Sequence, residues 1–251
     1  MEWYLILALV GAGLVAGFIN TVAGGGSVIT LPLLMFIGLP ANVANGTNRI
    51  SILFQSIVGI NTFSRNKVVK FGDDFRLAIP AGIGAAAGAL TAVKINADLL
   101  KWIISGLMVL MLLMVIFNPD AWVKQKAGEV KSKPTLVQYV IFFFIGIYGG
   151  FIQVGVGFFL LAGLVMGCGY DLIKANAVKV LIVLVFTIVS LLIFLTGSQV
   201  DILAGLLLAA GSMAGAWAGA KFTIRGGSKY IRYFLIATLI LMILKLFGVF
   251  G

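Results

Sequence analysis

The chain of 251 residues is 61% hydrophobic and only 10% charged, whereas a soluble domain is about 45–50% apolar and about 25% charged. This composition excludes a soluble globular protein, because no soluble fold of this size could bury so much apolar surface, and it indicates a polytopic membrane protein. The net charge of +10 is typical of the cytoplasmic loops of such a protein rather than of a nucleic-acid-binding surface.

Hydrophobic runs separated by breakers predict an all-α protein of ten helices. In chain order we expect helices at residues 2–19, 28–39, 48–63, 77–93, 99–117, 136–152, 157–167, 177–195, 202–221 and 230–249. The first is a retained helix rather than a signal peptide, because Glu2 stands where a basic region would be needed. The segments 28–39 and 157–167 are too short to span a bilayer, which takes about 20 helical residues.

The two short segments occupy corresponding places in two halves of the chain. The stretch "GFINTVAGGG" (residues 17–26) resembles "GFIQVGVGFF" (residues 150–159). Further along, the same comparison matches Asn45 with Asn176, Gly84 with Gly215 and Gly88 with Gly219. We expect an N-terminal transmembrane repeat at 1–117, a basic cytoplasmic linker at 118–134 and a C-terminal transmembrane repeat at 135–251. Five segments in each half is an odd number, which predicts two repeats of inverted topology.

Lys and Arg test this topology. Thirteen of them fall in the loops near 61–76, 118–134, 168–176 and 221–232, which share one side of the predicted membrane. Four fall on the other side: Arg49, Lys94, Lys101 and Lys245. Because cytoplasmic loops are rich in Lys and Arg, both termini are expected to be extracytoplasmic.

The interruptions of the two short helices are candidate binding elements. Unwound backbone at membrane depth is tolerated only inside protein or beside a water-filled cavity, and paired interruptions in two halves point to the binding site of a transporter. The predicted site residues are Asn20, Thr21, Gly24, Gly25, Gly26 and Ser27 from the first break, with Gln153, Gly155 and Gly157 from the second. The alternative is that the glycines only let helices pack closely or form a plain turn.

A second pair of polar clusters lies at residues 41–50 and 173–182. The first contains Asn45, Asn48 and Arg49, and the second contains Asn176 and Lys179. Each has an Asn in a predicted loop and a cation just inside the following helix, where free N–H groups and the helix dipole hold anions. Neither cation has an evident acid partner. The alternative is that Arg49 and Lys179 extend to the lipid headgroups.

The absences are also informative. The chain has no His, and its eight acidic residues all lie at termini, loops or helix ends. An interior with cations and without carboxylates is expected to select anions. No metal-ligand cluster, nucleotide-binding loop or nucleophile motif is evident, so we expect no enzyme activity, no metal and no cofactor. A fixed scaffold would not require paired polar breaks.

The stretches "GFINTVAGGGSVITLPLL" and "GLPANVANGTNRI", the basic linker and the later "GGFIQVGVGFF" resemble the TauE/SafE family, also called the 4-toluene sulfonate uptake permease family. The resemblance covers nearly the whole chain. In the second half Gln153 stands where the first half has Asn20, and Gly155 and Gly157 replace the triple glycine. The resemblance implies bacterial or archaeal membrane proteins that move sulfite, sulfoacetate or other sulfonates.

We therefore expect a secondary transporter in the cell inner membrane that exports small sulfur-containing anions by alternating access around a site between the repeats. A passive anion channel and a transporter of another oxyanion remain alternatives. The expected partners are the anion and the lipid bilayer, not nucleic acid, and a homodimer stays open.

Overall fold

The computed structural model describes residues 2–69, 71–106 and 134–246, without the side chains of residues 71, 73 and 227–246. The predicted all-α class is confirmed, since the described residues contain helices and turns but no strand. The helices are α1 (Trp3–Val22), α2 (Ser27–Phe36), α3 (Ala41–Arg65), α4 (Phe71–Asp74), the 3-10 turn η1 (Phe75–Leu77), α5 (Ala78–Lys94), α7 (Leu136–Phe151), α8 (Val156–Ala162), the π-helical turn η3 (Gly163–Gly167), α9 (Leu172–Thr196) and α10 (Ile202–Leu246).

Helix length and composition confirm a multi-pass membrane protein. Four helices among the described residues are long and apolar enough to cross a bilayer: Trp3–Val22, Phe75–Lys94, Leu172–Thr196 and Ile202–Gly226. In contrast, α2 has ten residues and α8 has seven, so each extends over only about half of the membrane core or less. Both predicted short segments are therefore present.

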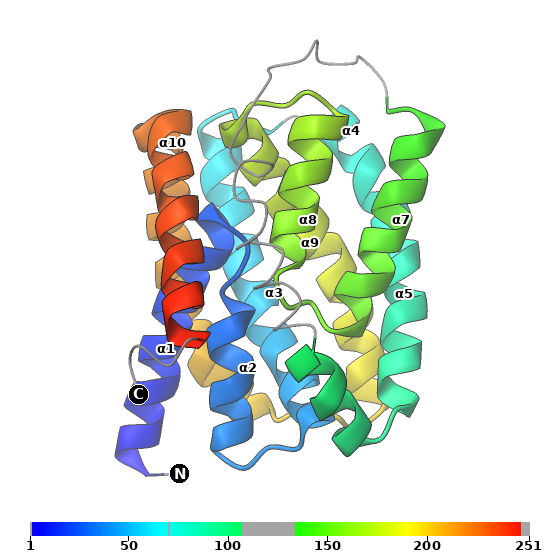
Figure 1. Cartoon of the computed structure of the whole chain (residues 1–251), viewed down its shortest axis with the longest axis vertical. Coiled ribbons are helices and arrows are strands. Elements are labelled where there is room, and N and C mark those ends of the chain that lie inside the picture. Colours follow the sequence, from blue (N-terminus) through cyan, green and yellow to red (C-terminus); the bar gives the residue numbers. More distant parts are fainter. Residues whose placement is uncertain (1, 70, 107–133, 247–251) are drawn as a thin grey trace.

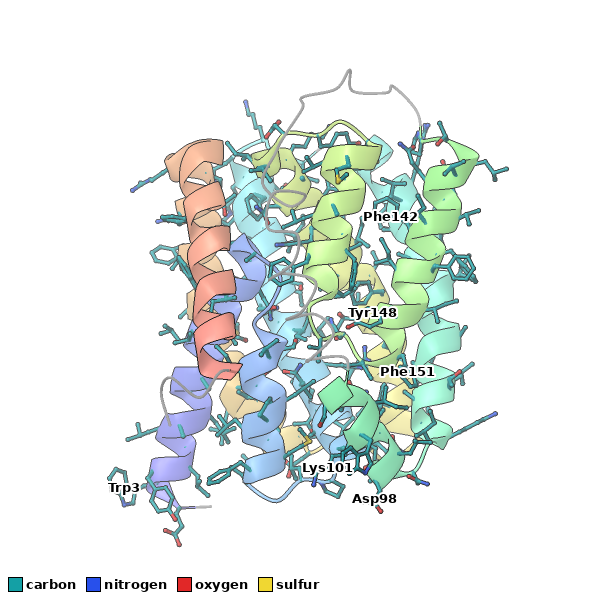
Figure 2. The ribbon with its side chains drawn as sticks, in the orientation of Figure 1. Trp3, Asp98, Lys101, Phe142, Tyr148 and Phe151 are labelled. Carbon is teal, nitrogen blue, oxygen red and sulfur yellow. The ribbon has the colours of Figure 1, made fainter. Side chains whose placement is uncertain are left out.

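The short helices belong to two hairpins that enter the molecule from opposite ends (Figure 1). α1 begins at the lower end of the view and turns inside the protein, and α2 returns to that end. α7 descends from the upper end, and α8 returns upward. The long helices α3 and α9 cross the full height between them. Figure 2 marks the two levels, with Trp3, Asp98 and Lys101 at the lower end and Tyr148 nearer mid-height.

The turns of the two hairpins meet, backbone against backbone. A Cβ added to Gly24 would overlap the backbone of Gly157, and one added to Gly157 would overlap Gly24. Gly24 also has a φ of +95°, a conformation that residues with a side chain rarely adopt. Tyr148 closes the second turn, because its hydroxyl donates a hydrogen bond to the Val154 carbonyl at 2.6 Å.

Glycines bring two helix pairs into close contact. On α1, Gly13 and Gly17 face the backbone of α10 at Leu208 and Ser212. The pair α5 and α7 shows the same kind of contact, where Gly146 and Gly150 of α7 face Ala81 and Ala85 of α5. These are small-residue interfaces of the kind that membrane helices use.

The sequence-based matching of glycines between the halves is one helical turn out of register. Val10 of α1 and Phe143 of α7 are equivalent when residues 17–26 are aligned with 150–159. Gly84 faces the Phe143 carbonyl, whereas the Val10 carbonyl is faced by Gly211 and not by Gly215. Gly88 likewise corresponds to Gly215 rather than to Gly219. A stripe of glycines every four residues looks the same after a shift of four, so only the packing partners distinguish the registers.

Three predicted helix boundaries are wrong in an informative way. The predicted helix 48–63 begins earlier, at Ala41, directly after the N-cap residue Pro40. The predicted helix 177–195 begins at Leu172, where the Asp171 carboxylate accepts hydrogen bonds from the backbone N–H groups of Ile173 and Lys174. The Asn-rich stretches that predicted loops are therefore helical. The predicted helices 202–221 and 230–249 are one element, α10, because nothing between them removes a backbone donor.

The fifth predicted helix, 99–117, is helical up to residue 106, and its remainder lies outside the described residues. The linker 118–134 lies outside them as well, apart from Pro134. The division into domains at these positions stays a prediction.

The helix contacts yield a matched stability test on α1. Gly13→Ala would push a methyl group into the Leu208 carbonyl, whereas a Cβ at Gly11 meets nothing within 4 Å. Overpacking costs about 1–3 kcal/mol, so we expect Gly13→Ala to lower the melting temperature of the detergent-purified protein by roughly 2–12 °C. Gly11→Ala should leave the melting temperature unchanged or raise it, because Ala favours helix. Equal behaviour of the two variants would contradict the packing.

Candidate functional site

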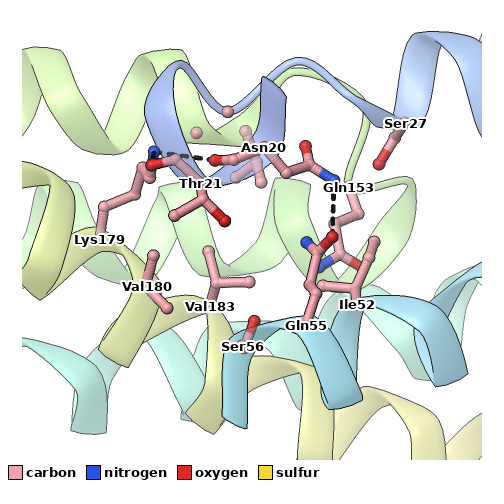
Figure 3. Close-up of a pocket in the computed structure, with 13 residues that line it drawn as sticks. Asn20, Thr21, Ser27, Ile52, Gln55, Ser56, Gln153, Lys179, Val180 and Val183 are labelled. Carbon is pink, nitrogen blue, oxygen red and sulfur yellow. Dashed lines mark hydrogen bonds between the residues drawn. The ribbon is translucent and has the colours of Figure 1, made fainter. Parts of the chain in front are cut away.

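A small cavity lies where the two hairpin turns meet the long helices α3 and α9 (Figure 3). Its volume is about 20 Å³, which is close to the room taken by one water molecule. The hairpins contribute Asn20, Thr21, Gly24, Ser27, Gln153, Val156 and Gly157, and the long helices contribute Ile52, Gln55, Ser56, Lys179, Val180 and Val183.

The cavity brings together part of the predicted site. The predicted residues that line it are Asn20, Thr21, Gly24, Ser27, Gln153, Gly157 and Lys179. The predicted residues that do not line it are Gly25, Gly26, Asn45, Asn48, Arg49, Gly155 and Asn176. The second group lies around the cavity and holds the hairpins in place.

Arg49 lies well inside α3 and extends to the carboxyl end of α7. Its Nη2 donates to the Gly150 carbonyl at 2.6 Å, and its Nη1 donates to the Gly149 carbonyl at 3.2 Å and to Gln153 Oε1 at 3.3 Å. The last carbonyls of a helix have no partner within it and carry the negative end of the helix dipole. Arg49 therefore caps the interrupted helix of the other half.

Lys179 makes the matching contact in the opposite direction. From α9 its Nζ donates to the carbonyls of Asn20 and Thr21, at 2.9 and 3.0 Å, and to Asn176 Oδ1 at 2.6 Å. Asn20 and Thr21 belong to the last turn of α1. Lys179 thus caps α1, and its three donor hydrogens have three acceptors.

Two expectations about these cations are wrong. Arg49 and Lys179 do not stand at helix N-termini, because α3 and α9 begin several residues earlier than predicted. They also do not extend to the lipid headgroups, since the exposed fraction is 0% for Arg49 and 1% for Lys179. Their attraction is to the carboxyl ends of helices, where a cation is favourable.

The predicted asparagines reinforce the same arrangement. Asn45 Nδ2 donates to the Phe151 carbonyl, the last of α7, at 2.7 Å. Asn48 lies against α2, where its Oδ1 accepts from the Thr30 hydroxyl at 2.7 Å and its Nδ2 donates to Ser27 Oγ at 3.3 Å. Asn176 accepts from Lys179. These side chains position the hairpins.

The glycine amides of the first turn are less available than the sequence suggests. The Gly24 N–H donates to the Ile19 carbonyl at 2.9 Å, and the Gly26 N–H donates to Asn20 Oδ1 at 2.7 Å. Gly25 lies beside the ring of Phe158, which a Cβ at this position would touch. The N–H groups of Gly24 and Gly26 are therefore not free to bind a ligand in this conformation.

Sequence reasoning missed the wall of the cavity that α3 supplies. Gln55 and Ser56 line it, and both are buried. A signal was present: Gln55 follows Asn48 by seven residues, which is two helical turns and so the same face of α3. From α9, Val180 and Val183 add apolar surface beside the polar Lys179, and Ile52 of α3 is apolar as well. Each long helix thus gives the cavity both polar and apolar lining.

The two buried cations lack carboxylate partners. In the described part of the chain, neither Arg49 nor Lys179 forms an ion pair; Lys174 pairs with Asp74 at 3.4 Å. Both cations are instead surrounded by backbone carbonyls. Arg49 also lies over the ring of Phe194, whose centroid is 4.6 Å from the guanidinium carbon. Uncompensated positive charge in a low-dielectric interior attracts anions strongly.

Two interrupted helices that meet at a buried cavity in a helical membrane protein are the features of a membrane transporter. The comparison with known families agrees with this class. The family model described as sulfite exporter TauE/SafE matches residues 9–246. The chain therefore belongs to the TauE/SafE family, as the sequence motifs predicted.

Curated relatives carry names of the same class. A probable membrane transporter protein of Haemophilus influenzae is 30% identical over 96% of this chain and 94% of its own length. The probable membrane transporter protein ORF9 of a Sinorhizobium species is 28% identical over 98% of this chain and 94% of its own length. The protein YdhB of Bacillus subtilis, named in the same way, is 26% identical over 87% and 89%. No solved structure matches the chain.

The crossed capping predicts that both buried cations stabilise the fold. Arg49→Met or Lys179→Met would leave helix carbonyls buried without donors, at a cost of about 1–3 kcal/mol or more. We expect each variant to lower the melting temperature by roughly 2–12 °C. Lys101→Met, which removes an exposed charge, is the control and should melt like the parent. If Arg49→Met and Lys179→Met also melt like the parent, the capping contacts do not support the fold.

Proposed function

We propose that this protein is a secondary transporter that exports a small sulfur-containing anion, such as sulfite or an organosulfonate, across the cell inner membrane. The observation that carries the proposal is Lys179, a buried ammonium that lines the cavity between the hairpin turns and forms no ion pair within the described residues. The name of the family model, a sulfite exporter, supports sulfur anions and the direction.

The charges favour an anion over a cation or a neutral solute. Arg49 and Lys179 place two positive charges in or beside the cavity, and no carboxylate lines it. Removing such charges from water without a counterion is costly, so an anion between the hairpins would gain from the positive potential. Substrate oxygens would accept hydrogen bonds from the predicted residue Ser27 and from Ser56 of α3.

Alternating access would result from movement of the two halves as inverted repeats. Support comes from the hairpins that enter from opposite ends (Figure 1) and from the reciprocal capping of α7 by Arg49 and of α1 by Lys179. The cavity volume of about 20 Å³ suffices for little more than a water molecule. A sulfite ion would need the turns at Gly24 and Gly157 to separate.

The transport proposal is tested by counterflow in proteoliposomes that are loaded with unlabelled anion and offered labelled sulfite, sulfoacetate, sulfate, thiosulfate or taurine. We expect saturable uptake of sulfite or a sulfonate. Ser27→Ala should weaken the affinity about 10- to 150-fold, because a hydrogen bond to a charged group contributes about 1.5–3 kcal/mol. Ser105→Ala, at an exposed hydroxyl bonded to its own helix, is the matched control. Flux that rises linearly with concentration would indicate a channel instead.

The orientation proposal places the ends of α3 and η3 in the cytoplasm and both termini outside, following the excess of Lys and Arg near those ends. In a Cys168→Ser background, Lys67→Cys should resist a membrane-impermeant maleimide added to intact cells, whereas Lys101→Cys at the opposite end should react. Lys67 follows α3, and both lysines are exposed. The reverse labelling pattern would overturn the orientation.

A further inference from the structure

We propose that hydrogen bonds fix the side-chain amides of Asn20 and Gln153 with their oxygens turned away from the cavity. The Gln55 amide is then oriented so that its Nε2 is the main hydrogen-bond donor to a bound oxyanion that carries no proton on oxygen. This inference rests on the anion site proposed above and specifies which anions it accepts. It assigns a binding role to Gln55 and a positioning role to Asn20.

The first fixed amide is that of Asn20. Its Oδ1 accepts the backbone N–H of Gly26 at 2.7 Å, and a backbone N–H can only donate. The oxygen of Asn20 must therefore face Gly26, so its Nδ2 faces the other way, toward Gln55 (Figure 3).

The orientation of Asn20 determines that of Gln55. Asn20 Nδ2 lies 3.5 Å from Gln55 Oε1. With the Gln55 amide reversed, two NH₂ groups would face each other without an acceptor between them. Gln55 Oε1 is therefore directed at Asn20, and Nε2 is left for the cavity that Gln55 lines. No hydrogen bond among the described residues uses this nitrogen as a donor.

The same logic applies on the side of the second hairpin. Gln153 Oε1 accepts from Arg49 Nη1 at 3.3 Å, and a guanidinium has donors only. Gln153 Nε2 therefore points away from Arg49 and donates to Thr187 Oγ1 at 3.0 Å. Gln153 has a φ of +65°, a strained backbone conformation for a residue with a side chain. The Gln153 amide is thus held through its oxygen by Arg49 and through its nitrogen by Thr187.

The side-chain amide oxygens that line the cavity and the two carbonyls at the end of α1 already accept hydrogen bonds. Lys179 Nζ takes the carbonyl oxygens of Asn20 and Thr21, and Gly26 and Arg49 take the two amide oxygens. Ser27 Oγ accepts from Asn48, so its own hydrogen is available to donate. Two hydroxyls are exceptions. The Thr21 hydroxyl hydrogen goes to the Gly17 carbonyl at 2.8 Å, which leaves a lone pair, and the Ser56 hydroxyl, which also lines the cavity, can accept as well as donate.

A ligand with a proton on oxygen would meet few acceptors in this cavity. A buried donor without a partner loses its hydrogen bond to water, which corresponds to a loss of affinity of about 5- to 150-fold. A sulfonate or a sulfate has only acceptors. A phosphate or phosphonate monoanion of the same shape and charge carries a hydroxyl, and should be rejected.

Methanesulfonate and methylphosphonate provide the test, in a mildly acidic buffer where both are monoanions that differ by one proton on oxygen. Binding of each to the purified protein is measured by the rise in melting temperature with ligand concentration. We expect methanesulfonate to bind at least about 5-fold tighter than methylphosphonate. Equal affinities would overturn the donor arrangement and leave the anion site intact, whereas failure of both anions to bind would contradict the anion site itself.

Variants of Gln55 then test its role. Gln55→Leu removes the donor, and Gln55→Glu replaces it by an acceptor of the same shape. Both should weaken methanesulfonate binding by about 10-fold or more, and Gln55→Glu should also lower or invert the preference over methylphosphonate. Gln199→Leu is the matched control, because this half-buried glutamine donates to the Val93 carbonyl outside the cavity; the preference of this variant should equal that of the parent. An unchanged preference in folded Gln55→Glu would contradict the assignment.

Discussion

Two helices that end inside a membrane protein require a replacement for their missing backbone partners, and much of this structure follows from how that requirement is met. α1 and α7 each stop within the protein, where lipid offers no hydrogen bonds to the last carbonyls. Lys179 and Arg49 supply the donors, each from the half of the chain opposite to the helix that it caps. Each hairpin is thus held by a long helix of the other half, which brings the two turns and the cavity together.

Because Lys179 caps a helix, the residue that supplies positive charge at the cavity differs from the residues that can donate hydrogen bonds to a ligand. When Lys179 is protonated, its three hydrogens are taken up by three oxygens, and none of these oxygens belongs to a carboxylate that would neutralise the charge. Hydrogen bonds to a ligand would then come from buried neutral groups such as Ser27, Gln55 and Ser56. A cation that is tied to protein carbonyls attracts an anion without clamping it, which suits a site that must also release what it binds.

The sequence was sufficient for the features that depend on local pattern. Apolar runs indicated a helical membrane protein, and short runs with adjoining glycines located both hairpins. The charged residues of the interior were also evident, but the groups that they contact were not, because the helix carbonyls that Arg49 and Lys179 cap lie 100 to 159 residues away in the chain. The starts of α3 and α9 were missed because Asn45 and Asn176 favour loops unless their amides find partners that suit a helix. Asn45 finds the distant Phe151 carbonyl, and Asn176 finds Lys179 on the next turn of its own helix. Gln55 required knowledge of which face of α3 meets the hairpins.

The order of the capping partners along the chain has a consequence for biogenesis. The carbonyls that Lys179 caps belong to α1, which is already made when α9 emerges from the ribosome. Arg49 is made before its partners, because they follow 100 to 104 residues later in the chain. At a synthesis rate of about 5–20 residues per second, its guanidinium would wait roughly 5–20 s for them. During co-translational insertion, α3 therefore depends on the translocon or on water near the nascent chain to shelter this charge, and the first half of the protein cannot settle in the bilayer until α7 has arrived.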